Sequence, residues 1–185
     1  VVQVGTAGMD ALKPLWVMAM ESLLTPDAIL LKNDSSAREL EKLPRGVEVI
    51  KGGVPDVVEV VENGFTYFAD LLKGQKTGWF YDQRDNHKLI AGMAKRKTVL
   101  DVYAHSGGFG LLAAKDGAKE VTLVDSSALA LDLARMAAEK NSVQATFLHG
   151  DAFELMQKLA EEGKQYDIVV ADPPPFVKAK KDIAA

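Results

Sequence analysis

Residues 98–115, TVLDVYAHSGGFGLLAAK, decide the fold. The stretch begins with the apolar and β-branched residues of a buried strand, turns at Ser106-Gly107-Gly108, and continues as an apolar helix. A strand, a glycine turn and a helix in direct succession form the first half of a βαβ unit. We therefore predict a strand over Thr98–Tyr103 and a helix over Phe109–Lys115.

The same alternation continues to residue 171. Strands are predicted at Val121–Val124, Ala145–Leu148 and Tyr166–Ala171, with helices at Ser127–Lys140 and Ala152–Glu162. This order is typical of an α/β fold in which helices cover a parallel sheet. Right-handed crossovers then place the carboxyl ends of all four strands along one edge of the sheet.

Residues 1–72 have a different pattern, which predicts a small α+β domain. Apolar residues recur at helical spacing over Met9–Leu24, and strands are expected at Ala28–Leu31 and Gly46–Ile50. Two further β-rich runs, Val57–Glu62 and Phe65–Asp70, flank Asn63-Gly64, which is a strong hairpin signal. We therefore expect two domains, residues 1–72 and residues 73–185.

Composition excludes several classes of protein. The chain has 185 residues, 48% of them hydrophobic and 26% charged, which are ordinary globular values. It holds no apolar run long enough to span a membrane and no signal peptide, and the lack of cysteine excludes disulfides and thiolate chemistry within these residues. Three scattered histidines predict no metal site. We expect a cytoplasmic protein, and the start at Val1 suggests part of a longer chain.

Basic residues gather in two islands on an acidic chain of net charge −4. Residues 73–97 carry seven basic and two acidic side chains, and residues 177–185 carry three and one. Each island is either solvated surface or a surface that contacts phosphate.

Polar groups follow each predicted strand, where ligands bind in open α/β sheets. The first strand carries Asp101 and ends at the glycine turn, the second ends at Asp125, the third at Gly150-Asp151, and the fourth at Asp172-Pro173-Pro174. A carboxylate such as Asp125 can accept hydrogen bonds from both hydroxyls of a ribose. Each feature alone also fits a plain turn or a helix N-cap, but four in a row favour a binding site for a nucleotide-like ligand.

The glycine turn does not match the G-x-G-x-x-G pattern of dinucleotide-binding dehydrogenases, which argues against an oxidoreductase. A rigid proline loop after the fourth strand suits a flat base instead, because prolines fix the backbone and Phe176 can stack on a ring.

These motifs resemble those of class I S-adenosylmethionine (SAM)-dependent methyltransferases. Val99-Leu100-Asp101 through Phe109 is similar to their first motif, Val124-Asp125-Ser126 to their ribose-binding acid, and Asp172–Phe176 to their fourth motif. Residues 74–86, GQKTGWFYDQRDN, resemble the signature of the bacterial 23S ribosomal RNA large-subunit methyltransferase I family, which makes 5-methylcytosine. The resemblance spans nearly the whole chain and implies a Rossmann-like methyltransferase sheet, incomplete here, without that family's RNA-binding PUA domain and its C-terminal strands.

The resemblance also implies a cofactor, a partner and a set of site residues. SAM is the expected cofactor and ribosomal RNA the expected partner, with no metal and no membrane, and a homodimer is considered as the oligomeric state. The base-binding residues would be Asp172, Pro173, Pro174 and Phe176. The cofactor-binding residues would be Lys76, Gln83, Arg84, Asp101, Tyr103, Ser106, Gly107, Gly108, Asp125, Ser126, Asp151 and Ala152.

The sequence departs from the family at two places, and the reaction is open because the cysteine that the family uses lies outside these residues. His87 stands where the family usually has arginine, and the turn His105–Gly108 differs from the usual one. Methylation at cytosine C5 needs a thiolate that adds at C6, and the family places its cysteine beyond Ala185. N-methylation of guanine needs no thiol. A nucleotide-dependent oxidoreductase and a non-enzymatic adenosine-binding module are the other functions considered.

Overall fold

The computed structural model describes residues 1–74 and 78–174, and the chain forms two compact units. One comprises Val1–Val58 and Asp70–Trp79, and the other comprises Glu59–Ala69 and the residues from Phe80 onward. The expected boundary at residue 72 is therefore not where the compact units divide, since the segment Glu59–Ala69 belongs with the second unit.

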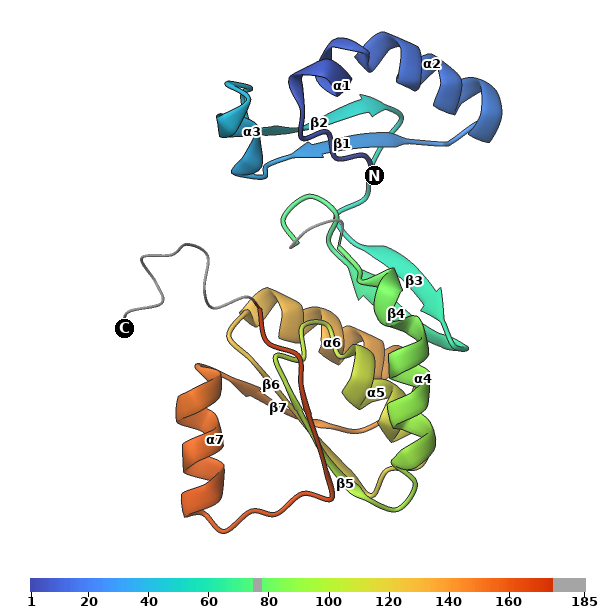
Figure 1. Ribbon diagram of the computed structural model, residues 1–185. Coiled ribbons are helices and arrows are strands. Elements are labelled where there is room, and N and C mark those ends of the chain that lie inside the picture. The colour runs from blue at the N-terminus through green and yellow to red at the C-terminus, as the bar shows by residue number, and fades with distance from the viewer. Residues whose placement is uncertain (75–77, 175–185) are drawn as a thin grey trace. The chain divides into compact units, whose positions relative to one another are not determined.

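The first unit is a two-stranded antiparallel sheet with three short helices (Figure 1). Its elements are α1 (Ala7–Ala11), α2 (Lys13–Leu24), β1 (Ile29–Asn33), α3 (Ala37–Leu40) and β2 (Gly46–Lys51). The single helix expected over Met9–Leu24 is wrong, because α1 ends at Ala11 and α2 begins at Lys13, with Leu12 between them and Pro14 in the first turn of α2. Proline lacks a backbone N–H and is tolerated only in that part of a helix.

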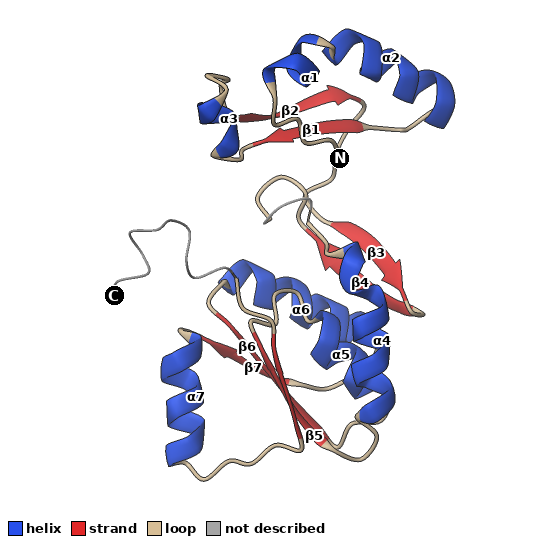
Figure 2. Ribbon diagram, in the orientation of Figure 1, coloured by secondary structure: helices blue, strands red, loops and turns tan. Residues whose placement is uncertain are grey.

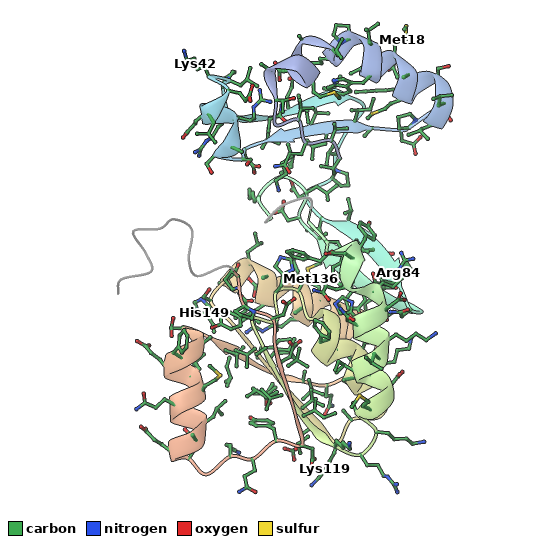
Figure 3. The ribbon with its side chains drawn as sticks, in the orientation of Figure 1. Met18, Lys42, Arg84, Lys119, Met136 and His149 are labelled. Carbon is green, nitrogen blue, oxygen red and sulfur yellow. The ribbon has the colours of Figure 1, made fainter. Side chains whose placement is uncertain are left out.

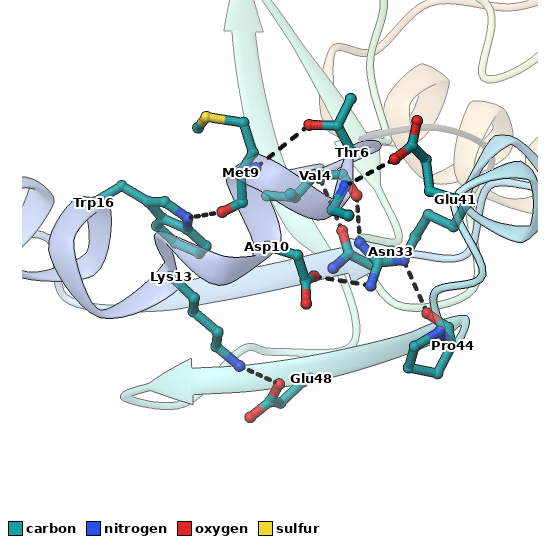
Figure 4. Close-up of polar contacts among 12 residues, drawn as sticks. Val4, Thr6, Met9, Asp10, Lys13, Trp16, Asn33, Glu41, Pro44 and Glu48 are labelled. Carbon is teal, nitrogen blue, oxygen red and sulfur yellow. Dashed lines mark hydrogen bonds and ion pairs between the residues drawn. The ribbon is translucent and has the colours of Figure 1, made fainter.

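Arg38 ties the N-terminal segment of this unit to the rest of it, through Val4, Asp10 and Pro44, which Figure 4 labels. Its side chain is buried and donates hydrogen bonds to the carbonyl oxygens of Val4 and Pro44 and to Oδ1 of Asp10. Asn33 Oδ1 accepts a further bond from the Val4 N–H at 2.8 Å. These bonds satisfy the buried guanidinium, which would otherwise be costly to bury.

The second unit holds the predicted parallel sheet, in the order β7-β6-β5-β8. Figure 1 shows α4, α5 and α6 on one side of it and α7 on the other, and Figure 2 shows the same layers by type of element. The elements are η1 (Tyr81–Gln83), α4 (Arg84–Met93), β5 (Thr98–Val102), α5 (Gly108–Lys115), β6 (Glu120–Asp125), α6 (Ala128–Lys140), β7 (Thr146–His149), α7 (Ala152–Glu161) and β8 (Ile168–Ala171). The α/β prediction is confirmed.

The β-hairpin of β3 (Val58–Glu62) and β4 (Phe65–Ala69) packs against α6. Phe65 and Tyr67 of β4 are fully buried, and Asn141 at the end of α6 pairs with the backbone of Thr66, accepting from its N–H at 3.0 Å and donating to its carbonyl at 2.7 Å. This burial explains why the hairpin belongs with the parallel sheet. No helix in residues 1–74 and 78–174 is long and apolar enough to cross a membrane.

Candidate cofactor site at the carboxyl edge of the sheet

The parallel register brings the carboxyl ends of β5, β6, β7 and β8 to one edge of the second unit. Val102 lies opposite both Val124 and Ala171, and Asp125 lies opposite His149. Figure 3 labels His149 at this edge and Lys119 at the opposite, amino edge. The groups that follow the four strands are thus gathered as the sequence predicts.

Asp125 is half-buried at the end of β6 and connects two loops of this edge. Its Oδ2 accepts a hydrogen bond from the His105 N–H at 2.7 Å, and its Oδ1 accepts one from the Ser127 N–H at 2.8 Å. Each carboxylate oxygen can accept a second bond, so both remain able to bind a ribose hydroxyl. The neighbouring Ser126 is exposed.

The turn after β5 has a tight left-handed course. Tyr103, His105 and Gly107 have φ values of 63°, 50° and 86°. A Cβ on Gly107 would lie 2.7 Å from Leu111 Cδ1, and one on Gly108 would lie 2.5 Å from His87 Nε2. Internal packing therefore demands glycine at both positions, whatever ligand lies over the turn.

Asp101 lies beneath this turn and is 1% exposed. Its Oδ2 accepts a hydrogen bond from the Gly110 N–H at 2.8 Å. The pKa of this carboxyl is raised to about 7: burial is the main cause, the Gly110 bond opposes it, and the charges of Asp125 and Asp172 add to it. Asp101 thus shapes the turn from below and is closed off from a ligand above it. Ser106 is equally buried, at 1%.

Asp151 caps helix α7, the structural alternative weighed from the sequence. Its Oδ1 accepts hydrogen bonds from the N–H groups of Phe153 at 2.8 Å and Glu154 at 3.2 Å. Asp151 is exposed and its other oxygen accepts no hydrogen bond from the residues that the structure describes, so capping leaves it able to bind a ligand. Ala152, next along the chain, is buried.

The motif after β8 meets the segment before α4. Gln83 Nε2 donates to Asp172 Oδ2 at 3.1 Å, and Asn86 Nδ2 donates to Gln83 Oε1 at 2.7 Å. Asp172, Pro173 and Pro174 are exposed. This contact joins Gln83 to the residue that follows β8, which sequence spacing did not reveal.

Arg84 faces the hairpin, with its Nε 3.7 Å from Glu62 Oε2. Lys76 and Phe176 lie outside the described residues, as does the basic island at 177–185.

His105 and Phe80 line the same turn and were missed as site residues. Their rings meet edge to face, with centroids 5.5 Å apart, and the His105 Nδ1 lies 3.1 Å from Ser106 Oγ. Burial lowers the pKa of His105, and the charge of Asp125 opposes that shift. Only their positions in the sequence could have indicated a role in the site, since Phe80 lies in the 74–86 stretch and His105 lies in the turn after β5.

Taken together, these residues fit a ligand with a ribose and a positive charge. Acidic side chains stand at the ends of β6, β7 and β8, and the left-handed turn leads into the first residue of α5. No group of three or more metal-ligating side chains within the described residues is arranged to hold a metal ion.

Comparisons with known proteins identify the family of the chain. A family model described as S-adenosylmethionine-dependent methyltransferase matches residues 40–184. Curated proteins named ribosomal RNA large subunit methyltransferase I are similar over 99% of the chain: that of Aeromonas salmonicida is 36% identical, and that of Aliivibrio fischeri (strain ATCC 700601 / ES114) is 37% identical. The match covers 47% of each relative, so the chain spans about half their length.

Solved structures show the same likeness. A methyltransferase complexed with SAH superposes with a TM-score of 0.78 and 26% identity, covering 92% of this chain and 44% of the other. The tRNA m1G37 methyltransferase of M. jannaschii, at 17% identity and a TM-score of 0.66 over 86% of this chain and 45% of its own, shares the fold.

Proposed function

Because this chain belongs to the S-adenosylmethionine-dependent methyltransferase family, we propose that it serves methyl transfer from SAM to a base of ribosomal RNA, with C5 of a cytosine in 23S ribosomal RNA as the target. The family assignment displaces the nucleotide-dependent oxidoreductase considered from the sequence. The RNA substrate is supported by the names of the relatives that match 99% of the chain.

The position of Asp125 carries the cofactor assignment. Its half-buried carboxylate stands at the end of β6 with lone pairs free for a ribose, directly beside the turn His105–Gly108. In this proposal Asp125 and Ser126 hold the ribose, Asp151 and Ala152 hold the adenine, and the methionine part lies over Gly107 and Gly108. Tyr103 and Ser106 belong to the same turn. When bound, SAM supplies an electrophilic methyl group on its sulfonium.

Asp172 is the residue proposed for the target base. It is exposed at the end of β8, followed by Pro173 and Pro174, and Gln83 holds one of its oxygens. A carboxylate there can accept a hydrogen bond from the exocyclic amine of a cytosine that has left its stack. Lys76, Arg84 and Phe176 stay predictions for contacts to the cofactor, the phosphates and the base.

The atom that is methylated separates two chemistries. Methylation at C5 needs a thiolate, and these 185 residues contain no cysteine, whereas N-methylation of guanine needs only an oriented amine. Nucleoside mass spectrometry after the full-length protein has acted on unmodified 23S ribosomal RNA with methyl-labelled SAM distinguishes them. We expect labelled 5-methylcytidine. Labelled methylguanosine would support the alternative.

If the full-length protein binds SAH but transfers no methyl group to RNA, the result favours the non-enzymatic adenosine-binding module considered from the sequence. Calorimetry with S-adenosylhomocysteine (SAH) and with NAD is the companion measurement, and we expect binding of SAH alone. Binding of NAD in preference to SAH would contradict the cofactor assignment. The homodimer stays a prediction, which light scattering tests.

A further inference from the structure

Three buried polar side chains lie beneath the first residue of α5, outside the site predicted from the sequence. Glu62 comes from β3, Tyr67 from β4 and His87 from α4, and they are 3%, 0% and 4% exposed. Polar groups this deep are normally held by specific partners, because burying them otherwise costs free energy.

Glu62 fixes the orientation of the His87 ring. The Nδ1 of His87 lies 2.7 Å from Glu62 Oε1, and Arg84 Nε lies 3.7 Å from the other oxygen of that carboxylate. Because a carboxylate oxygen only accepts, Nδ1 carries the proton of this bond. The Nε2 side of the ring then faces Gly108.

The ring and the tyrosine hold Gly108 from two sides. A Cβ at Gly108 would lie 2.5 Å from His87 Nε2 and 2.7 Å from its Cε1, so the ring packs directly on the glycine. The Tyr67 hydroxyl donates to the Gly108 carbonyl oxygen at 3.1 Å. The Phe109 ring stands edge-on to the imidazole, with centroids 4.5 Å apart. The start of α5 therefore has no room to shift toward α4, and the hydroxyl of Tyr67 ties it to the hairpin.

We propose that Glu62, Tyr67 and His87 are positioning residues for the cofactor, which makes hairpin β3–β4 part of the cofactor site. They act through Gly108, by fixing the backbone over which the amino-acid part of SAM lies; this step rests on the proposed function. An apolar pair of similar volume would pack here without the desolvation cost of a carboxylate. The polar pair adds a fixed ring orientation, which the glycine turn needs.

The test compares two ligands of the full-length protein by calorimetry. SAH has an amino-acid part and adenosine does not, whereas both have the ribose and the base. Gly108→Ala displaces the glycine and is expected to weaken SAH binding about tenfold. Glu62→Gln and Tyr67→Phe loosen its position and are expected to weaken SAH binding about threefold to tenfold. The affinity for adenosine is expected to change less than about twofold in each variant. Glu59→Gln is the matched control, since Glu59 lies on the same strand and its side chain forms an exposed ion pair with Lys140.

A double-mutant cycle shows whether the contact is direct. His87→Asn keeps a donor for Glu62 and removes the part of the ring that a Cβ at Gly108 would strike. The double variant His87→Asn with Gly108→Ala is therefore expected to bind SAH more tightly than Gly108→Ala alone. If His87→Asn does not fold, the SAH and adenosine affinities of Glu62→Gln and Tyr67→Phe test the positioning role.

The outcomes are separable. Equal losses for SAH and adenosine, or no loss in any variant, overturn the positioning role while the proposed function stands. If the wild-type protein binds neither ligand, the proposed function is overturned and this inference with it.

Discussion

The carboxylate of Asp101 accepts a hydrogen bond from the backbone N–H of Gly110 at 2.8 Å, within a fully buried site. A Cβ on Gly110 would lie 3.1 Å from the same carboxylate oxygen. The strand and the helix on either side of the glycine turn are therefore joined below it by one polar contact. Because burial raises the pKa of this carboxyl, the stability of the fold around the turn depends on pH.

Asp101→Asn tests this sensitivity. The pKa of Asp101 is about 7 in the folded protein against an ordinary value of 3.8, so between these values the folded chain holds a proton that the unfolded chain has released. The contribution of Asp101 to stability is therefore full below about pH 4 and falls as the pH rises to about 7. Asparagine does not titrate, and its Oδ1 can still accept from Gly110.

We expect the unfolding free energy of Asp101→Asn, relative to wild type, to increase with pH over this window by up to about 4 kcal/mol. Urea unfolding of both proteins between pH 4 and pH 8 measures it, and effects of the other titrating groups cancel in the difference. A difference that is constant with pH would show that the buried carboxyl keeps its ordinary pKa.

Asp125→Ala is expected to weaken SAH binding. Losing charge-assisted hydrogen bonds to the ribose costs about 1.5–3 kcal/mol, roughly a tenfold to hundredfold change in Kd. Since Asp125 also accepts from the N–H groups of His105 and Ser127, part of the loss comes from relaxation of the turn. Asp132→Ala, an exposed carboxylate on α6, is the control, and unchanged affinity in a folded Asp125→Ala protein would refute the ribose assignment.

Asn86→Asp tests the amide chain that orients Asp172. Asn86 donates to Gln83 Oε1, which leaves the Gln83 amine to donate to Asp172. An aspartate at 86 only accepts, so Gln83 would turn its amine toward residue 86 and its oxygen toward Asp172. We expect methyl transfer to slow about tenfold with SAH affinity unchanged. Asp85→Asn, an exposed neighbour, is the control, and a loss of SAH affinity instead would place Gln83 at the cofactor.

The alternation of strands and helices from Thr98 onward was predictable because it depends on local hydrophobic period and on turn chemistry. Asp125 and Asp151 could be assigned to the carboxyl edge for the same reason, since Asp125 ends β6 and Asp151 follows β7, and their binding of the cofactor stays a prediction. The boundary of α4 was harder to predict. It begins at Arg84, but residues 84–86 are polar and show no apolar period, so the sequence pattern does not indicate the first turn of this helix.

Contacts between distant segments could not be read from the sequence. Glu62 and His87 are 25 residues apart and Gln83 and Asp172 are 89 apart, and only tertiary packing brings them together. The burial of Asp101 could not be predicted from the sequence either. A carboxylate on a buried strand can face a ligand or lie under the turn, and the choice depends on how α5 packs on β5.

The turn between α4 and β5 is formed by Lys95, Arg96 and Lys97. All three are exposed and make no ion pair with the described residues. The turn pairs with the loop before β6, since Arg96 N donates to the Gly117 carbonyl at 2.7 Å and Lys119 N donates to the Lys97 carbonyl at 2.8 Å. The cation of Lys119 thus joins the three at the amino edge of the sheet, opposite the cofactor edge.

Replacing Lys95, Arg96 and Lys97 with alanine in the full-length protein is expected to weaken RNA binding and flatten its salt dependence. Each lost phosphate contact lowers the slope of log affinity against log salt by roughly 0.7–0.9, and SAH affinity should not change because the turn is a strand length from the cofactor. The control removes the same charge from Arg135, Lys140 and Lys158, of which the first two are already paired with Asp132 and Glu59. Equal slopes for both triple variants would mean that net charge alone attracts the RNA and that Lys95–Lys97 is a solvated turn.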